Sequence, residues 1–184
     1  MVKKQAKQLL VQALMDLLEE APLDKIDVRD MTVKAGLSRQ TFYYNFKNKQ
    51  DMVDWIFAKN NEKAKPAFTK KYSLYDYFLT ALKTISQYRS FYSSVLLGGY
   101  YQNTIPGPFE NGLINAVQDI EMHCASGRMN TEQWDALLFF SFGAKGMVMH
   151  WLSGDMRMSP EEMTKIILAN MPVQLQEYTD KYRK

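Results

Sequence analysis

The residues best suited to chemistry lie between Leu37 and Lys49, where the sequence reads LSRQTFYYNFKNK. This stretch joins four aromatic residues with an arginine, a glutamine and two lysines. A protein core has no place for those charges, and an ordinary solvated surface rarely carries neighbouring tyrosines. Guanidinium and amide groups form paired hydrogen bonds with base edges, and lysine attracts phosphate, so the mixture favours contact with nucleic acid.

Helical spacing divides the aromatic residues of this stretch between two faces. At 100° per residue, Phe42 and Phe46 share one face, which is expected to dock on neighbouring helices. The residues left to point outward are Gln40, Thr41, Tyr43 and Tyr44. For this helix taken alone, a solvated helix with two core phenylalanines is the alternative interpretation.

Charged residues stand at both ends of the expected helix. Arg39 lies in its first turn, the end that a recognition helix presents to base edges in the major groove. Lys47 and Lys49 follow at the start of the next helix, where lysine charge and exposed backbone amides can both face phosphate.

Capping residues indicate the elements that position these side chains. Asp27 is suited to cap a helix that Gly36 ends, and Ser38 is suited to cap the next one. The two helices therefore meet across a tight turn, which is the layout of a helix-turn-helix. An amphipathic helix precedes them, and Asn48 opens a fourth helix.

The stretch VRDMTVKAGLSRQTFYYNFKNKQDMV resembles the DNA-binding domain of the TetR family of transcription regulators, over roughly residues 3 to 65. The resemblance implies that Arg29 and the outward residues of the recognition helix approach bases or adjacent backbone. It also implies that Tyr43, Asn45 and Lys49 hold phosphates. Asn45 departs from the histidine of many members, but both side chains can donate to a phosphate oxygen. The DNA-binding candidates are Arg29, Ser38, Arg39, Gln40, Thr41, Tyr43, Tyr44, Asn45, Lys47 and Lys49.

Helical signals continue to the end of the chain, and no strand alternation exceeds four residues. We therefore expect an all-α protein of about nine helices. The expected domains are a helix-turn-helix domain at 1–48, a connecting helix and junction at 49–72, and a C-terminal helical domain at 73–184. That last domain resembles the shorter C-terminal domain of a TetR subgroup that contains regulators of dihydroxyacetone kinase operons. The stretches that carry this resemblance are RQTFYYNFKNKQDMVDWIF, YRSFYSSVL and GMVMHWLSGDMRMSPEEM.

A long helix expected from Thr131 to about Ser153 contains WDALLFFSFGAKGMVMHWL, which is apolar nearly all round. Such a helix must bury more than one face, and a chain of this size offers limited cover. Packing within the chain is one interpretation, and a homodimer contact is the favoured one, since in the family the last two helices of each subunit form the interface. The dimer candidates are Phe140, Gly143, Gly146, Met147, Trp151, Ile166 and Ile167.

Aromatic residues in the C-terminal half are candidates for an effector pocket, although plain core packing explains them equally well. These candidates are Tyr92, Tyr100, Tyr101, His123, Trp134 and Phe139. His123 lies beside Cys124, but both lack the partners that a metal site or a catalytic dyad needs. We expect no cofactor and no metal.

Composition and missing motifs narrow the class of protein further. A single cysteine excludes an internal disulfide framework, and no apolar run approaches the roughly 18 residues that span a bilayer. Residues 1–65 contain 12 lysines and arginines against 9 acidic residues, while residues 66–184 contain 11 of each. No phosphate loop, nucleophile elbow or H-E-x-x-H motif is present, so we expect no enzyme.

The sequence therefore predicts a cytoplasmic, homodimeric regulator that binds a palindromic operator in double-stranded DNA. The favoured regulation is a repressor released by a small-molecule effector. An activator controlled by a protein co-regulator is the alternative. A helical protein-interaction module that does not bind DNA is the alternative from another class.

Overall fold

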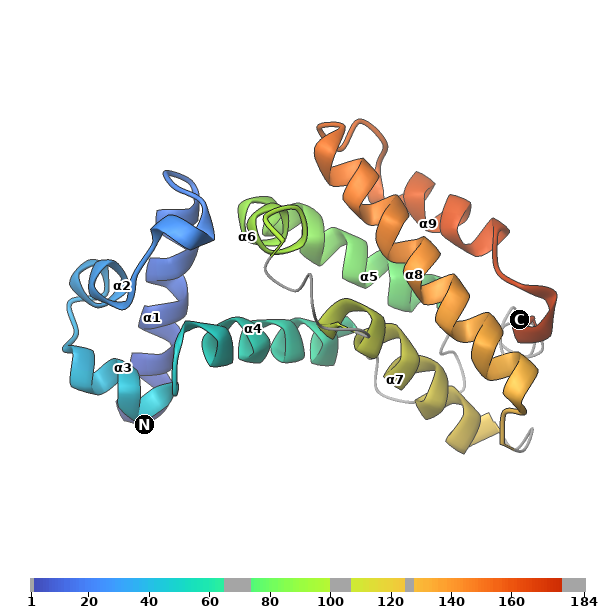
Figure 1. The fold of residues 1–184 in the computed structure, drawn as a ribbon, viewed down its shortest axis with the longest axis horizontal. Coiled ribbons are helices and arrows are strands. Elements are labelled where there is room, and N and C mark those ends of the chain that lie inside the picture. The colour runs from blue at the N-terminus through green and yellow to red at the C-terminus, as the bar shows by residue number, and fades with distance from the viewer. Residues whose placement is uncertain (1, 65–73, 100–106, 125–127, 177–184) are drawn as a thin grey trace. The chain divides into compact units, whose positions relative to one another are not determined.

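The computed structural model describes residues 2–64, 74–99, 107–124 and 128–176 of the 184-residue chain. Over these ranges the chain forms nine α-helices and two 3-10 turns, with no strand, so the expected all-α class is confirmed (Figure 1). The α-helices are α1 (Val2–Leu18), α2 (Val28–Lys34), α3 (Arg39–Asn45), α4 (Lys49–Ala64), α5 (Leu74–Gln87), α6 (Arg89–Leu96), α7 (Pro108–Cys124), α8 (Thr131–Ser153) and α9 (Pro160–Ala169). The 3-10 turns are η1 (Leu23–Lys25) and η2 (Val173–Leu175).

The chain divides into two compact units. The N-terminal unit comprises residues 1–57 and 88–103, and the C-terminal unit comprises residues 58–87 and 104–184. Helix α6 thus groups with α1 to α3, whereas the sequence suggested that it belongs to the C-terminal domain. The domain limits expected from the sequence stay a prediction.

Side-chain caps fix where several helices begin. The Asn130 side chain accepts a hydrogen bond from the Gln133 backbone N–H, and the Gln133 side chain accepts one from the Asn130 N–H. Ser159 and Glu162 form the same reciprocal box at the start of α9, where Pro160 occupies the first turn. Each box satisfies N–H groups that have no partner inside the helix.

The N-terminal unit is built around α1, which packs against α2, α3 and α6. Leu10 and Leu14 of α1 are buried together with Met31 of α2 and Phe42 of α3. Apolar burial of this kind is the main stabilising contribution for a small helical unit.

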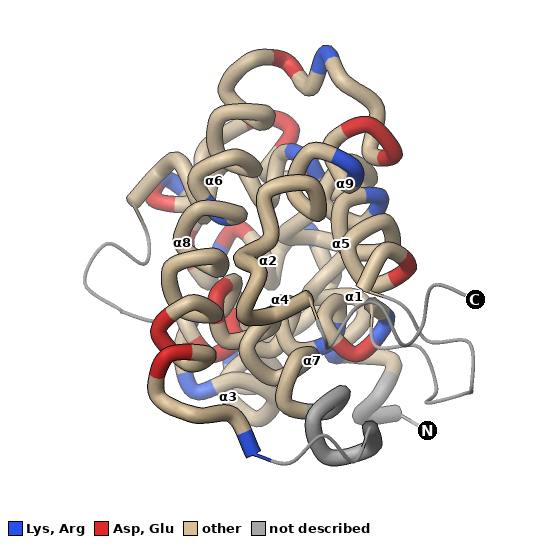
Figure 2. Tube along the Cα trace, turned by 90° about the vertical axis from the view of Figure 1, so that its right-hand side faces the viewer, with Lys and Arg blue, Asp and Glu red and all other residues tan. Residues whose placement is uncertain are grey.

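In the C-terminal unit α5 packs against α9, and α7 packs against α8. Phe78 of α5 meets Phe140 of α8 edge-on, with ring centroids 6.1 Å apart. Lys83 of α5 forms a 2.8 Å ion pair with Glu161 of α9. Figure 2 shows basic and acidic residues interspersed along the described helices, and neither sign fills a helix by itself.

Candidate DNA-binding site and self-association surface

Local hydrogen bonds fix the first helix of the helix-turn-helix. Asp27 Oδ1 accepts hydrogen bonds from the backbone N–H groups of Arg29 (2.6 Å) and Asp30 (3.2 Å), and Asp30 Oδ2 accepts one from Asp27 N (2.9 Å). The N–H groups of Asp30 and Arg29 lower the pKa of Asp27, with help from the charges of Arg39 and Arg29. The cap expected at Asp27 is confirmed.

The turn between α2 and α3 uses the expected glycine and serine. Gly36 has a positive φ of 66°, a conformation that costs glycine little, and Leu37 N donates to Thr32 O at 2.9 Å. Ser38 Oγ then accepts from Thr41 N at 3.1 Å and caps α3. These bonds fix the direction in which α3 leaves α2.

Phe42 on the inner face of α3 and Phe46, the extended residue that directly follows the helix, are both buried as the sequence predicted. Their ring centroids lie 5.8 Å apart, and the Phe46 ring meets Trp55 of α4 at 6.0 Å. Lys7 of α1 places its Nζ 4.6 Å from the ring centroids of both Phe46 and Trp55. This cation–π contact joins α1, the end of α3 and α4.

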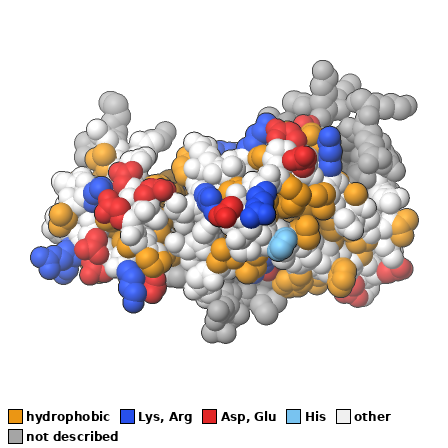
Figure 3. Space-filling model, turned by 90° about the horizontal axis from the view of Figure 1, so that it is seen from above, with side chains coloured by type: hydrophobic (Ala, Val, Ile, Leu, Met, Phe, Trp, Pro, Cys, Tyr) orange, Lys and Arg blue, Asp and Glu red, His pale blue; other side chains and the backbone are white. Residues whose placement is uncertain are grey.

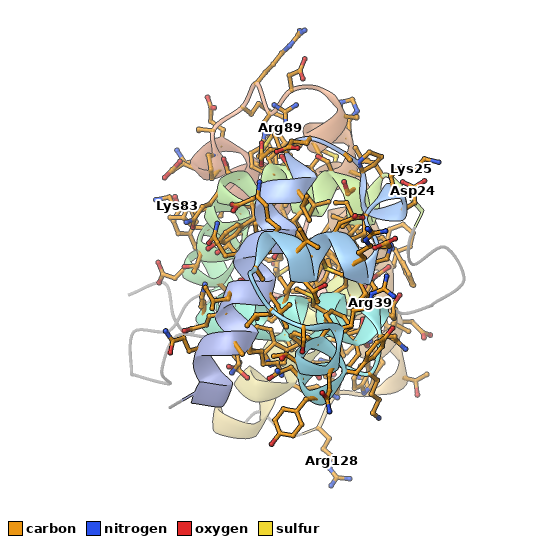
Figure 4. The ribbon with its side chains drawn as sticks, turned by 90° about the vertical axis from the view of Figure 1, so that its left-hand side faces the viewer. Asp24, Lys25, Arg39, Lys83, Arg89 and Arg128 are labelled. Carbon is orange, nitrogen blue, oxygen red and sulfur yellow. The ribbon has the colours of Figure 1, made fainter. Side chains whose placement is uncertain are left out.

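The outer face of α3 is exposed and polar. Arg39 and Gln40 are exposed in the first turn, and the Tyr43 and Tyr44 side chains are 58% and 69% exposed. Figure 4 shows the side of this unit that carries α2 and α3, with Arg39 labelled. The division of α3 into a buried phenylalanine face and an exposed polar face is confirmed.

Three of the DNA-binding candidates in and just before α3 already form local hydrogen bonds. Ser38 Oγ and Thr41 Oγ1 lie 2.9 Å apart, and Thr41 is half-buried rather than fully outward. Asn45 Nδ2 donates to Thr41 O at 2.8 Å, while Asn45 Oδ1 is buried with no hydrogen-bond partner among the described residues. Ser38, Thr41 and Asn45 therefore shape the helix in the free protein.

Arg29 and Val33, one turn apart, are among the exposed residues of α2. Arg29, a DNA-binding candidate, is exposed, and Val33 is 73% exposed. Val33 was not predicted to be part of this exposed surface. Its position four residues after Arg29 puts both residues on one face of the helix.

The two lysines after α3 differ in their surroundings. Lys47 is exposed, and its ammonium has no hydrogen-bond or ion-pair partner in the described part of the chain. Lys49 Nζ instead donates to Leu23 O at 2.7 Å and to Ile26 O at 2.8 Å. Burial lowers the pKa of Lys49, while the nearby charges of Asp24 and Asp27 oppose that shift.

The second candidate surface is an apolar groove of about 410 Å³ between α8 and α9. Its lining residues are Phe139, Phe140, Gly143, Ala144, Met147, Ile166, Ile167, Asn170 and Pro172. The structure thus brings five of the seven dimer candidates into one groove. Hydrophobic side chains gather on the part of the surface to which α8 and α9 contribute (Figure 3).

The glycines of α8 face open space in the part of the chain that the structure describes. A Cβ added to Gly143 or Gly146 would meet no atom within 4 Å. Glycine inside a helix costs roughly 1 kcal/mol relative to alanine, so these two positions weaken α8 without relieving any contact of the free chain. Phe139, one turn before Gly143, is 79% exposed.

Gly146 and Trp151 are the two dimer candidates that do not line the groove, and Trp151 has a role inside the chain. It is buried, and its indole Nε1–H donates to Met158 O at 2.8 Å in the turn between α8 and α9. Its side chain is therefore used inside the chain, because a buried indole needs an acceptor that the nearby turn supplies.

The effector candidates are not gathered into one site among the described residues. Tyr92 is buried in the N-terminal unit, with its ring 5.3 Å from Phe57 and 5.2 Å from Phe91. Trp134 is half-buried in the C-terminal unit, and Phe139 lines the groove of α8 and α9. Tyr100, Tyr101 and the side chain of His123 lie outside the described residues.

An ion pair between α7 and α8, with a buried carboxylate, was not predicted from the sequence. Lys145 Nζ donates to Glu110 Oε1 at 2.9 Å, and Glu110 is 1% exposed. The two residues are 35 positions apart, and neither belongs to a recognisable motif.

The described part of the chain contains neither a membrane-spanning helix nor a cluster of metal-binding side chains. There, no helix is long and apolar enough to cross a membrane. Within the same ranges, no three histidine, cysteine or acidic residues come together where a metal ion could bind.

A helix-turn-helix on an all-helical scaffold places this chain in the class of DNA-binding regulators. A model described as "Transcriptional regulator C-terminal region" matches residues 72–172, and a model described as "Bacterial regulatory proteins, tetR family" matches residues 10–56. Since the first match covers more than half of the chain, the protein belongs to the TetR family of bacterial transcription regulators. The family is a class of regulators and not a class of enzymes.

Comparison with individual proteins agrees with this assignment. The HTH-type dhaKLM operon transcriptional activator DhaS of Lactococcus lactis subsp. lactis is 24% identical over 91 residues. That alignment spans 50% of this chain and 49% of the relative, so the chain matches about half of that protein's length.

Solved structures share the fold over nearly the whole chain. Dihydroxyacetone kinase operon activator DhaS superposes with a TM-score of 0.69 at 18% identity, covering 95% of this chain and 98% of that one. A TetR regulator from Rhodococcus sp. RHA1 has a TM-score of 0.64 at 15% identity, covering 94% and 97%. A TetR-family regulator from Streptomyces coelicolor has a TM-score of 0.66 at 14% identity, covering 93% and 83%.

Proposed function

We propose that this protein is a homodimeric transcription regulator that binds a palindromic DNA site through α2 and α3. The observation that carries the proposal is the division of α3. Phe42 and Phe46 anchor the helix in the core, so the exposed side chains Arg39, Gln40 and Tyr43 are held on a rigid element. Base recognition in the major groove requires polar side chains that are presented from a rigid element.

The exposed side chains suit different parts of a DNA site. Arg39 can pair with the O6 and N7 atoms of guanine, and Gln40 can pair with the N6 and N7 atoms of adenine. Arg29 and Tyr44 suit neighbouring bases or the sugar–phosphate backbone. Lys47 supplies a mobile positive charge that suits a phosphate.

A second copy of the chain is the proposed occupant of the groove between α8 and α9. Gly143, which lines the groove and is exposed, favours this occupant, because a small residue lets another helix approach closely. A two-fold pair would bring the same groove of each subunit together and present two copies of α3 about 34 Å apart along the DNA. The DNA sequence bound by such a pair would contain two half-sites of opposite orientation.

Regulation has two candidate forms. The sequence favoured a repressor released by a small molecule, but the described effector candidates do not gather into one pocket. The curated relative and one similar solved structure are both named DhaS and described as operon activators, which favours activation over repression. In either form the signal must bind the two states of the dimer with different affinity. The proposed place of action is the cytoplasm, where bacterial DNA lies.

Selection of bound duplexes from a random DNA pool tests the proposal. Purified protein near physiological salt is expected to enrich one palindromic sequence, and binding to it should weaken steeply as salt rises. The rival is a helical interaction module that uses the Tyr43 and Tyr44 surface for a protein partner. That rival predicts no enriched DNA sequence.

A further inference from the structure

Lys49 is the first residue of α4, and its side chain reaches back along the chain. Its Nζ donates to Leu23 O at 2.7 Å and to Ile26 O at 2.8 Å, across 26 and 23 residues. Two short bonds from one ammonium to main-chain oxygens are directional, and the side chain is partly shielded from water.

The two carbonyl groups belong to the segment that leads into α2. Leu23 begins the 3-10 turn η1, and Ile26 directly precedes Asp27, the cap of α2. The side chains of Leu23 and Ile26 are both buried, so this segment is fixed in the core on one side and by Lys49 on the other. Asp24 and Lys25, labelled in Figure 4, mark the same turn.

Lys49 thus joins the two ends of the helix-turn-helix. The segment at residues 23–26 enters α2, and α4 begins four residues after α3 ends. A bond between them fixes where the pair α2 and α3 starts and where it stops. Leu23 O also accepts a hydrogen bond from Ile26 N at 3.3 Å, and the three donors of a lysine ammonium allow it to bond both carbonyls at once.

Lys47 provides the contrast within the same turn. Its backbone N–H donates to Asp51 Oδ2 at 2.8 Å, but its ammonium is exposed and unpaired within the described ranges. Of the two lysines, Lys47 carries the charge that is free to meet a phosphate.

We propose that Lys49 is a positioning residue of the DNA-binding unit and that Lys47 supplies the phosphate contact at this turn. The inference rests on the proposed DNA binding and departs from the role that family resemblance gave Lys49. Because the ammonium is engaged by two carbonyls in the free protein, a phosphate would have to share it with them or replace them.

The test compares Lys49→Met with Lys47→Met in two measurements, urea unfolding of the free protein and the salt dependence of binding to the selected duplex. Lys49→Met is expected to unfold at lower urea and to bind DNA more weakly with an unchanged salt slope. Lys47→Met is expected to unfold like the unaltered protein and to reduce the slope by about 0.9 for each subunit. Lys49→Gln retains a donor without a charge, so it should recover part of the lost stability and keep the full slope.

The opposite pattern would overturn the inference. If Lys49→Gln and Lys49→Met unfold like Lys47→Met but reduce the salt slope, Lys49 is a phosphate contact. If Lys49→Met does not fold, Lys49→Gln decides the question by its slope. If the unaltered protein binds no DNA, the proposed function fails, and equal unfolding of the Lys49 and Lys47 variants would then reject the positioning role.

Discussion

Lys145 Nζ lies 2.9 Å from Glu110 Oε1 and joins α8 to the first turn of α7. The other carboxylate oxygen of Glu110 is buried and accepts no hydrogen bond within the described part of the chain. A buried carboxylate of this kind depends on its single cation, because removal of the cation leaves an uncompensated charge in a region of low polarity.

Lys145→Met should therefore destabilise the C-terminal unit. We expect a loss of about 3 kcal/mol in the free energy of unfolding, at the lower end of the range for buried pairs because Lys145 is partly exposed. Urea unfolding measures this loss. The double variant Glu110→Gln, Lys145→Met is the control and should recover most of it, whereas equal instability of the single and double variants would contradict the account.

Replacement of Gly143 by alanine should have opposite effects on the helix and on self-association. Alanine favours α8 by about 1 kcal/mol, and no atom of the described residues opposes the new methyl group. A closely packed partner helix would oppose it, so the dimer should dissociate at a higher protein concentration. Sedimentation velocity over a concentration series measures the change.

Asp135→Ala, at an exposed position of α8 outside the groove, is the matched control for the glycine variant. It should leave the dissociation constant unchanged. A dimer strengthened by Gly143→Ala would place the interface elsewhere on the chain.

Phe42→Ala and Gln40→Ala should separate the two faces of α3. Removal of the fully buried Phe42 ring should cost about 3–5 kcal/mol of unfolding free energy. Removal of the exposed Gln40 amide should change stability by less than about 0.5 kcal/mol, yet relax base preference by about 1–3 kcal/mol at one position of each half-site. Unfolding curves and binding to single-base variants of the selected duplex test both statements.

The cap of α2 should make the N-terminal unit sensitive to acid. The pKa of Asp27 is lower in the folded chain than its ordinary value of 3.8, so the ionised form favours folding. Its contribution is complete above that ordinary value and is lost as the pH falls through the lowered one. Asp27→Asn keeps an oxygen that can cap the helix but does not titrate.

Unfolding midpoints of the two proteins between pH 2 and pH 6 test this prediction. The advantage of the unaltered protein over Asp27→Asn should be present near pH 6 and shrink below about pH 4. A difference that stays constant over this range would show that the carboxylate of Asp27 does not stabilise the fold.

Local rules predicted much of the fold. The caps at Asp27 and Ser38 lie beside the N–H groups that they satisfy, so their roles follow from spacing alone. The inward direction of Phe42 follows from helical periodicity in the same way, whereas Phe46 is buried from an extended position just after α3.

Contacts between distant parts of the chain could not be predicted. Lys49 meets carbonyls 23 and 26 residues away, and Lys145 meets a carboxylate 35 residues away, so no local pattern reveals either pairing. Trp151 was expected at the dimer surface because α8 is apolar on nearly every side. Which apolar face is buried within the chain depends on the packing of α5, α7 and α9, which sequence periodicity does not specify.

The number of chains bound to one selected duplex tests the central proposal most directly. Sedimentation velocity of the complex should give two chains on the intact palindrome, and scrambling one half-site should weaken binding by at least about tenfold, the equivalent of 1.4 kcal/mol. One chain per duplex, or equal affinity for the intact and half-scrambled duplexes, would contradict a homodimer that reads two half-sites.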